Sequence, residues 1–221
     1  MSDVSHLSVF RAGPDSQPAS DAAWSRAGLP PLSKRVFDRA VAMALLMVLV
    51  PVGAVLVVLN PFLNAGPLIY RQDRMGYQCR RFAAFKFRTM RRAKGRERGA
   101  FDALEADRIT VLGRFLRRSR LDELPQIINV LRGEMSLIGP RPDSYDHACV
   151  YLRDIAGYAE RHSVRPGISG LAQTEVGYVD GIDGIRRKVA ADLHYIAHAS
   201  FRLDLWIAWR TIGVVLARKG A

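Results

Sequence analysis

The sequence predicts an α+β fold, mainly helical, in which a re-entrant membrane helix hairpin joins a small polar domain with a minor β element and interfacial amphipathic helices. Three observations predict it. An uncharged apolar run covers residues 40–59, and a strongly basic segment covers residues 71–120. Beyond them, helical stretches alternate with short runs broken by Gly and Pro. With 221 residues, 49% of them hydrophobic, the chain is long enough for one domain with a core.

The composition divides the chain into three parts. Residues 1–32 are rich in Ala, Ser, Pro and Gly, and they lack the basic start and early apolar run of a secretory signal. We therefore expect a disordered tail at 1–32, a membrane helix at 33–62 and a polar domain at 63–221. The two cysteines, Cys79 and Cys149, cannot make a disulfide framework, which favours a reducing compartment.

The apolar run at residues 40–59 has the length of a membrane helix. Its 20 uncharged positions would form a helix of about 30 Å, the thickness of the hydrocarbon core of a bilayer. Pro51 removes a backbone hydrogen bond near its middle and favours a bend. Because both flanks are basic, as cytoplasmic flanks usually are, we expect a helix broken at Pro51 that enters and leaves the same face. A straight span and a buried helix of a soluble domain are the alternatives. The basic flanks are Lys34, Arg35 and Arg39 before the run and Arg71, Arg74, Arg80 and Arg81 after it.

The C-terminal stretch, residues 200–220, reads as an amphipathic helix. Tryptophans bordered by basic residues are typical of a helix that lies in the lipid headgroup region. An ordinary core helix with one apolar face fits the same pattern. The apolar face consists of Leu205, Trp206, Trp209, Ile212 and Leu216.

The basic segment predicts an anionic partner. Residues 71–120 hold 16 Lys and Arg against five Asp and Glu, which is 11 of the net charge of +12. Nucleic acid, acidic lipid headgroups and phosphorylated small molecules all offer phosphates to arginine. In the same region, residues 66–90 predict one or two short strands, and residues 107–120 predict a turn into a helix with an arginine-rich face. Residues 121–132 predict a helix of about ten residues ended by Gly133.

Two adjacent carboxylates, Asp122 and Glu123, precede Pro125 at the start of this helix. A proline is tolerated in the first turn of a helix, so both carboxylates are expected where exposed amides and the helix dipole favour anions. Helix capping would explain such a pair. A carboxylate pair can also hold Mg²⁺, and nearby cations can bind phosphate, a combination that suggests phosphoryl transfer. The candidate cations are Lys86, Arg88, Arg117 and Arg141.

Long motifs between residues 33 and 217 resemble those of the bacterial sugar transferases, the monotopic phosphoglycosyl transferases that begin the assembly of lipid-linked exopolysaccharides. The motifs are KRVFDRAVA, GPLIYRQDRMG, FKFRTM, DRITVLGRFLRRSRLDELPQIINVLRGEMSLIGPRP, VRPGISGLAQ and DLHYIAHASFRLDLWI. The chain is most similar to single-domain members that load undecaprenyl phosphate with a hexose phosphate in succinoglycan-type synthesis. The resemblance implies a re-entrant helix and a catalytic domain on the cytoplasmic face of the bacterial inner membrane.

The resemblance also implies the reaction. A hexose 1-phosphate would pass from a UDP-hexose, with galactose and glucose the leading candidates, to undecaprenyl phosphate, and UMP would leave. Asp122 takes the place of the family's nucleophile and would carry the phosphosugar covalently. Asp122 and Glu123 would hold Mg²⁺, although Glu123 could instead orient the acceptor phosphate. Lys86, Arg88, Arg117 and Arg141 would bind substrate phosphate. A homodimer is compatible with an enzyme lying on a membrane.

Two positions depart from the family pattern. Val50 replaces the serine that usually precedes the proline, so a capping hydroxyl is missing at the expected bend. The stretch TEVGYVDG replaces a Val-Asn-Gly-Arg-like segment, which leaves the identity of the sugar open.

Two functions of other classes are weaker interpretations. A membrane-tethered nucleic-acid-binding protein is disfavoured because the aromatic residues of the basic segment form no stacking motif. A non-catalytic scaffold of polysaccharide export is disfavoured by the intact Asp122 and Glu123 pair. Salt-dependent DNA binding without a response to UDP-sugars would favour the first of these.

Overall fold

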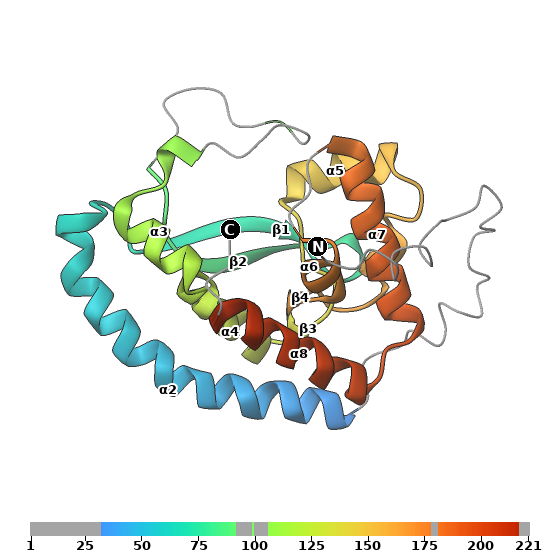
Figure 1. Ribbon diagram of the computed structural model, residues 1–221, viewed down its shortest axis with the longest axis horizontal. Helices are drawn as coiled ribbons and strands as arrows, with labels where there is room; N and C mark the ends of the chain where they lie inside the picture. The colour runs from blue at the N-terminus through green and yellow to red at the C-terminus, as the bar shows by residue number, and fades with distance from the viewer. Residues whose placement is uncertain (1–31, 92–98, 100–105, 178–180, 217–221) are drawn as a thin grey trace, which may run out of the picture.

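A computed structural model describes residues 32–91, 99, 106–177 and 181–216 (Figure 1). The predicted tail, apart from Leu32, lies outside these residues. The described part is mainly helical with two small two-stranded sheets, as expected. Its elements are α2 (Leu32–Leu63), β1 (Ile69–Met75), η2 (Tyr77–Cys79), β2 (Arg81–Phe87), η3 (Ala106–Arg108), α3 (Val111–Arg118), η4 (Leu121–Gln126), α4 (Ile127–Leu131), β3 (Ser136–Ile138), α5 (Tyr145–Asp154), η5 (Glu160–Ser163), β4 (Gly167–Ser169), α6 (Leu171–Glu175), α7 (Gly181–Ala197) and α8 (Phe201–Leu216), where η marks a 3₁₀ helix.

Helix α2 is one continuous helix rather than the two helices expected on either side of Pro51. Pro51 has no N–H to donate to the Met47 carbonyl, but a helix can pass through a proline by bending. Figure 1 shows α2 curving around the rest of the molecule. The helix is long and apolar enough to cross a membrane, and only 11% of its most apolar 18-residue stretch is buried by protein. That exposure excludes the buried helix of a soluble domain.

Both ends of α2 are bonded to the polar domain. Near its N-terminus, the Nζ atom of Lys34 lies 2.5 Å from Oδ2 of Asp204 in α8. At its C-terminus, the Asn60 amide donates to the Gly66 carbonyl at 2.7 Å. The amide of Asn64 donates to the Arg88 carbonyl, also at 2.7 Å. Between these ends, one side of α2 packs on the domain, with Ala42 buried against α4 and Leu56 buried against Phe87 and Leu116, so the domain holds the helix along its length.

Strands β1 and β2 lie where the sequence predicts one or two short strands, and they pair as an antiparallel hairpin with Tyr70 opposite Lys86. The buried Asn129 of α4 joins the free edge of β2: its side chain accepts from the Phe85 N–H at 3.1 Å and donates to the Ala83 carbonyl at 2.7 Å. These bonds satisfy edge groups that would otherwise be unpaired. As a result, the segment that contains Asp122 and Glu123 packs against β2.

The second sheet is a parallel pair, β3 and β4, whose backbones approach very closely. A Cβ atom added at Gly167 would lie 2.2 Å from the Gly139 nitrogen. A Cβ atom added at Gly170 would lie 2.3 Å from the Gly139 oxygen. Only glycine permits such contacts. They hold the loop that follows β3, which carries Arg141, against β4 and the start of α6.

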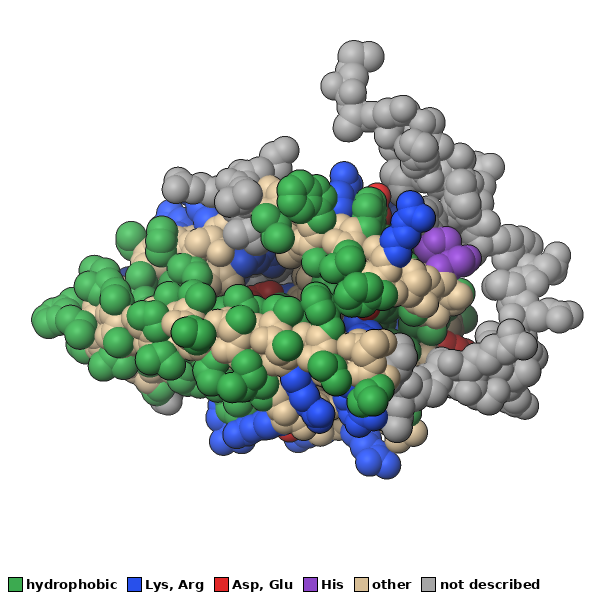
Figure 2. Space-filling model, turned by 90° about the horizontal axis from the view of Figure 1, so that it is seen from below, with side chains coloured by type: hydrophobic (Ala, Val, Ile, Leu, Met, Phe, Trp, Pro, Cys, Tyr) green, Lys and Arg blue, Asp and Glu red, His purple; other side chains and the backbone are tan. Residues whose placement is uncertain are grey.

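Helix α8 lies where the sequence predicts a C-terminal helix, and its place in the lipid headgroup region stays a prediction. It buries Ile207 and exposes Leu205, Trp206 and Trp209, the last of these at 73%. The Arg210 guanidinium lies 5.3 Å from the Trp206 ring centroid. Figure 2 shows apolar side chains along α2 and over neighbouring elements, with Lys and Arg side chains along one border. The side chain of Leu216 lies outside the described part of the chain.

Candidate active site

Asp122 and Glu123 lie in the first turn of η4, next to β2 and α3. The predicted ten-residue helix is instead a 3₁₀ helix, η4, followed by α4, and Pro125 lies in the 3₁₀ part. Both carboxylates are buried, with 8% and 7% of each residue exposed. The Oδ1 atom of Asp122 is buried and accepts no hydrogen bond from the described residues. This oxygen therefore does not cap a helix, and capping does not explain its burial.

Glu123 is bonded to two cations. Its Oε1 atom accepts from Nζ of Lys86 at 2.9 Å, and its Oε2 atom accepts from Nη1 of Arg141 at 2.9 Å. The Nη2 atom of Arg141 also donates to Oε1, so the guanidinium and the carboxylate meet as two forks. Burial alone would raise the pKa of Glu123, but Arg141 and Lys86 hold it well below its usual range. Glu123 is therefore ionised at neutral pH.

Asp122 and Lys86 titrate close to neutral pH. Burial, and then the negative charge of Glu123, raises the pKa of Asp122 to about 6, against the opposing charges of Lys86, Arg117 and Arg141. Burial lowers the pKa of Lys86 to about 8, although the charge of Glu123 opposes the shift. Shifts of this size in adjacent buried groups are typical of functional sites.

The other two predicted cations lie in different places. Arg117 of α3 donates from Nε to Oγ1 of Thr89 at 3.0 Å, and its charge acts on Asp122. Arg88 instead donates to the Asn64 carbonyl at the junction of α2 and β1. The hydrogen bonds described for the Arg88 side chain go to this junction and to neither carboxylate. The structure thus brings Lys86, Arg117 and Arg141 around the carboxylates and ties Arg88 to the end of α2.

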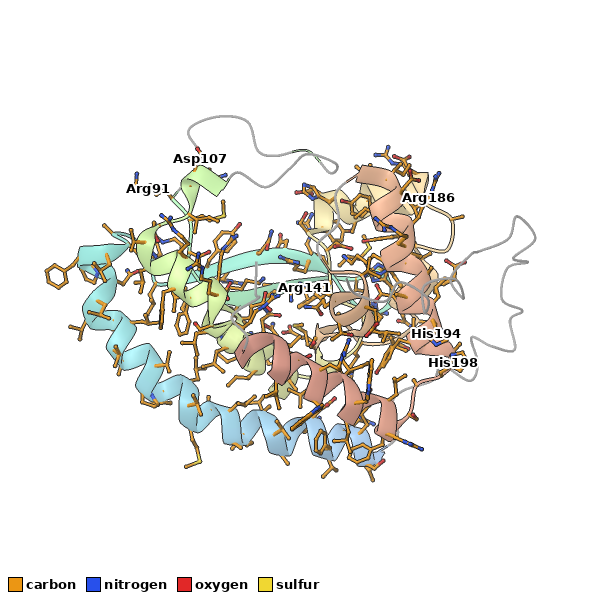
Figure 3. The ribbon with its side chains drawn as sticks, viewed as in Figure 1. Arg91, Asp107, Arg141, Arg186, His194 and His198 are labelled. Carbon is orange, nitrogen blue, oxygen red and sulfur yellow. The ribbon has the colours of Figure 1, made fainter. Side chains whose placement is uncertain are left out.

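Arg74 is a cation of the site that sequence reasoning assigned only to a membrane flank. Its guanidinium donates to the Pro142 carbonyl and to the Gln72 side chain. Burial, and then the charge of Arg141, lowers its pKa, whereas Asp143 and Glu123 oppose the shift. Figure 3 places Arg141 near the middle of the molecule. Four cations, Arg74, Lys86, Arg117 and Arg141, thus surround two carboxylates, and the excess positive charge suits a diphosphate.

The segment that carries the two carboxylates lies next to α2, because both η4 and α4 contact this helix. In Figure 2, acidic and basic side chains are visible in a recess beside α2. This arrangement places polar chemistry next to a surface that lipid could cover.

The residues fit a metal ion that is shared with a substrate. Within the described ranges, no group of three His, Cys, Asp or Glu side chains could hold a metal. Both oxygens of Glu123 are bonded to cations, whereas Oδ1 of Asp122 has a free lone pair. Mg²⁺ commonly binds one or two protein carboxylates together with substrate phosphates. Asp122 meets that requirement, and Oε2 of Glu123, which accepts one bond from Arg141, could supply a second ligand.

Comparison with known proteins gives a consistent assignment. The UDP-N-acetylgalactosamine-undecaprenyl-phosphate N-acetylgalactosaminephosphotransferase of Aeromonas hydrophila is 40% identical over 189 residues, which cover 85% of this chain and 44% of that protein. The UDP-glucose:undecaprenyl-phosphate glucose-1-phosphate transferase of Escherichia coli K12 is 37% identical over 197 residues, 88% of this chain and 42% of that protein. The exopolysaccharide production protein PSS of Rhizobium leguminosarum is 35% identical over 191 residues, 84% of this chain and 96% of that protein.

The chain therefore spans less than half of the first two relatives and nearly all of the third. The family model described as bacterial sugar transferase matches residues 30–218, which include α2, both carboxylates and α8. The chain belongs to the bacterial sugar transferase family.

Proposed function

We propose that this protein transfers a sugar 1-phosphate from a UDP-hexose to undecaprenyl phosphate and releases UMP. The observation that carries the proposal is the buried carboxylate pair, in which Asp122 keeps an unpartnered oxygen while Glu123 is neutralised by Lys86 and Arg141. The names of the Aeromonas and Escherichia relatives support the general reaction, with N-acetylgalactosamine in one and glucose in the other. The donor sugar of this chain is proposed to be glucose or galactose.

The proposed chemistry has two steps. In the first, a carboxylate oxygen of Asp122 attacks the phosphorus that bears the sugar; a P–O bond forms, the diphosphate bond breaks, and UMP leaves with the electron pair. In the second, a phosphate oxygen of the lipid attacks the same phosphorus and frees the Asp122 carboxylate. An anionic nucleophile is repelled by a diphosphate, and Lys86, Arg117 and Arg141 offset that repulsion. Mg²⁺, when bound, would neutralise further charge on the diphosphate.

Glu123 has a separate proposed role. It holds Lys86 and Arg141 beside Asp122, because Lys86 is bonded to one of its oxygens and Arg141 to both. Oε2 of Glu123 accepts one bond and keeps a lone pair with which it could also bind Mg²⁺. We expect Arg88 to act on the site through the end of α2, where its guanidinium is bonded to Asn64.

Release of UMP tests the function, and its pH dependence tests the residues. Purified protein with undecaprenyl phosphate and Mg²⁺ should release UMP from UDP-glucose or UDP-galactose; UDP-N-acetylgalactosamine is included because of the Aeromonas relative. With pKa values of about 6 for Asp122 and about 8 for Lys86, kcat/KM should rise through pH 6 as Asp122 ionises and fall above pH 8 as Lys86 loses its proton.

The matched control for the alkaline limb is Lys86→Arg, which keeps a positive charge above pH 8. This variant should shift or remove the alkaline fall, whatever its effect on the maximal rate. An alkaline limb that stays at pH 8 in Lys86→Arg would rule out Lys86 as its source. No UMP from any of the three sugar nucleotides would contradict the proposed function.

We also propose that α2 enters and leaves the membrane on the cytoplasmic face of the inner membrane. Lys34 at one end and Asn64 at the other are bonded to a single polar domain, and such a domain lies on one side of a membrane. The exposed side chains of Met47 and Phe62, at 79% and 83%, would then face lipid. The tryptophans of α8 would lie at the headgroup level beside them.

Cysteine labelling tests this topology. In a background of Cys79→Ser and Cys149→Ser, the exposed Ser33 and Arg71 are replaced by cysteine one at a time. Neither cysteine should react with a membrane-impermeant maleimide in intact cells, and both should react after permeabilisation. Labelling of one end alone from outside would establish a straight span and reject the same-side arrangement.

A further inference from the structure

A cluster of four charged side chains, two of them fully buried and two partly buried, lies behind the loop that carries Arg141. Asp143, Arg161, Lys188 and Asp192, here called the ion cluster, come from this loop, from η5 and from α7. Arg161 bonds both acids, with Nη1 at 2.5 Å from Oδ2 of Asp143 and Nη2 at 2.6 Å from Oδ2 of Asp192. The Nζ atom of Lys188 donates to Oδ1 of Asp143. The formal charges cancel, so the cluster could be buried without net charge.

Stability alone is a weak reason for such a cluster. The side chains of Arg161 and Asp192 are each only 1% exposed, and desolvating ions usually offsets most of what their pairing contributes. Packed apolar residues of similar volume are often as stable. The contacts that the cluster makes with its surroundings therefore indicate its role better than the pairing does.

The ion cluster holds two parts of the Arg141 loop, the backbone of Arg141 and the side chain of Asp143. The Nη2 atom of Arg161 donates to the Arg141 carbonyl at 2.8 Å. Asp143, two residues further on, accepts from Arg161 and Lys188 and from the Tyr158 hydroxyl at 2.9 Å. Because a carboxylate with three donors has little freedom, these bonds fix the loop from the side of η5 and α7.

The hairpin holds the opposite side of the same loop. Arg74 of β1 donates to the Pro142 carbonyl, and the Met75 N–H donates to the Asp143 carbonyl at 3.2 Å. Three consecutive carbonyls, those of residues 141, 142 and 143, are thus engaged by groups from outside the loop. The Arg141 guanidinium therefore extends from a fixed backbone position to the Glu123 carboxylate.

We propose that Arg161, with the ion cluster, is a positioning residue for phosphate binding: it fixes the Arg141 backbone so that the Arg141 guanidinium meets a diphosphate with its fork aligned. The inference rests on the proposed function in taking a diphosphate as the ligand of Arg141. Arg161 does not touch the substrate in this arrangement. A bidentate contact depends steeply on alignment, so a loosened loop should weaken binding even where the fold persists.

Two buried tyrosines give a matched test. The Tyr158 hydroxyl donates to Asp143 at 2.9 Å. The Tyr195 hydroxyl donates to Asp204 at 2.8 Å and lies 3.3 Å from the Ile138 carbonyl oxygen, at the end of β3, so it bonds no residue from 141 to 143. Both residues are buried, and a change to Phe keeps the ring in each. Tyr158→Phe and Tyr195→Phe should therefore lose similar thermal stability. Only Tyr158→Phe should weaken the binding of inorganic pyrophosphate, by about three-fold or more, as measured by calorimetry on the full chain in detergent.

Arg161→Lys should have the larger effect. Lysine keeps the charge but cannot bond Asp143, Asp192 and the Arg141 carbonyl together, so we expect pyrophosphate binding to weaken by about ten-fold or more. In the UMP assay, the same variant should raise KM for the donor relative to wild type. Should Arg161→Lys fail to fold, the pair of tyrosine variants decides the matter.

The outcomes separate the two proposals. Wild-type protein that binds pyrophosphate but releases no UMP removes the proposed function and leaves the positioning role in place. Tyr158→Phe that binds pyrophosphate as tightly as Tyr195→Phe overturns the positioning role, and so does a folded Arg161→Lys with unchanged affinity. Wild-type protein that binds no pyrophosphate overturns it as well.

Discussion

Replacing Asp122 with asparagine should abolish turnover and the covalent adduct while leaving the protein folded. An amide is a poor nucleophile for phosphorus, so the rate should fall by about 10⁴ or more. With labelled UDP-sugar and Mg²⁺ but no lipid acceptor, wild-type protein should release UMP and retain label on Asp122, as mass spectrometry of its peptides would show. Full labelling of the variant, or an adduct on Glu123 of the wild type, would overturn the assignment.

The stability of Asp122→Asn separates this role from a structural one. The pKa of Asp122 is raised from 3.8 to about 6 in the folded protein. A carboxyl group with a raised pKa adds stability below pH 3.8, and that contribution is lost as the pH rises through about 6. At pH 8 the buried carboxylate opposes folding, so Asp122→Asn should match wild-type stability or exceed it by up to about 3 kcal/mol. A capping residue would instead lose about 1 kcal/mol on substitution.

Replacing Gly167 with alanine should destabilise the fold by about 3 kcal/mol or more. The added Cβ would lie 2.2 Å from the Gly139 nitrogen and 2.5 Å from the oxygens of Gly139 and Ser169. All three atoms belong to the backbone, so no side chain can rotate away, and β3 and β4 must separate. Because Gly139 precedes the Arg141 loop, binding of pyrophosphate should weaken too.

Gly213→Ala is the control for Gly167→Ala. A Cβ at Gly213 of α8 meets nothing within 4 Å. Alanine in a helix is favoured over glycine by up to about 1 kcal/mol, so this variant should be slightly more stable than wild type. Denaturation of the two variants in the same detergent compares them directly, and equal stabilities would contradict the close packing of β3 on β4.

The elements with local signals were predictable from the sequence. The β1–β2 hairpin is short and aromatic, and its strands are separated by only a few residues. Helix α3 begins where Thr110 supplies an N-cap, its hydroxyl accepting from the Gly113 N–H at 3.0 Å. The position of the helix that begins at Leu121 was predicted, but its type was not. Pro125 cannot donate a backbone hydrogen bond, and the first part, η4, is a 3₁₀ helix, which winds more tightly than an α-helix.

The candidate site was predictable only in part. The resemblance to a known family identified Asp122, Glu123 and Arg141 as site residues. The structure brings these residues together. The sequence could not place Arg88, because its bond to Asn64 depends on how α2 ends. It also missed Arg161, which is 31 positions from Asp192 and 18 from Asp143. Pairing of buried charges is a tertiary property, and hydrophobic periodicity carries no signal for it.

In the proposed membrane arrangement, the attachment of both ends of α2 to one domain determines how the proposed lipid acceptor reaches Asp122. A helix anchored at Lys34 and Asn64 cannot slide through the bilayer independently of the domain, so the protein itself sets the height of the Asp122 carboxylate above the hydrocarbon. The recess beside α2 would then stand at one fixed level (Figure 2). An acceptor whose phosphate travels at that level needs to search only the plane of the membrane, and encounter becomes a two-dimensional problem.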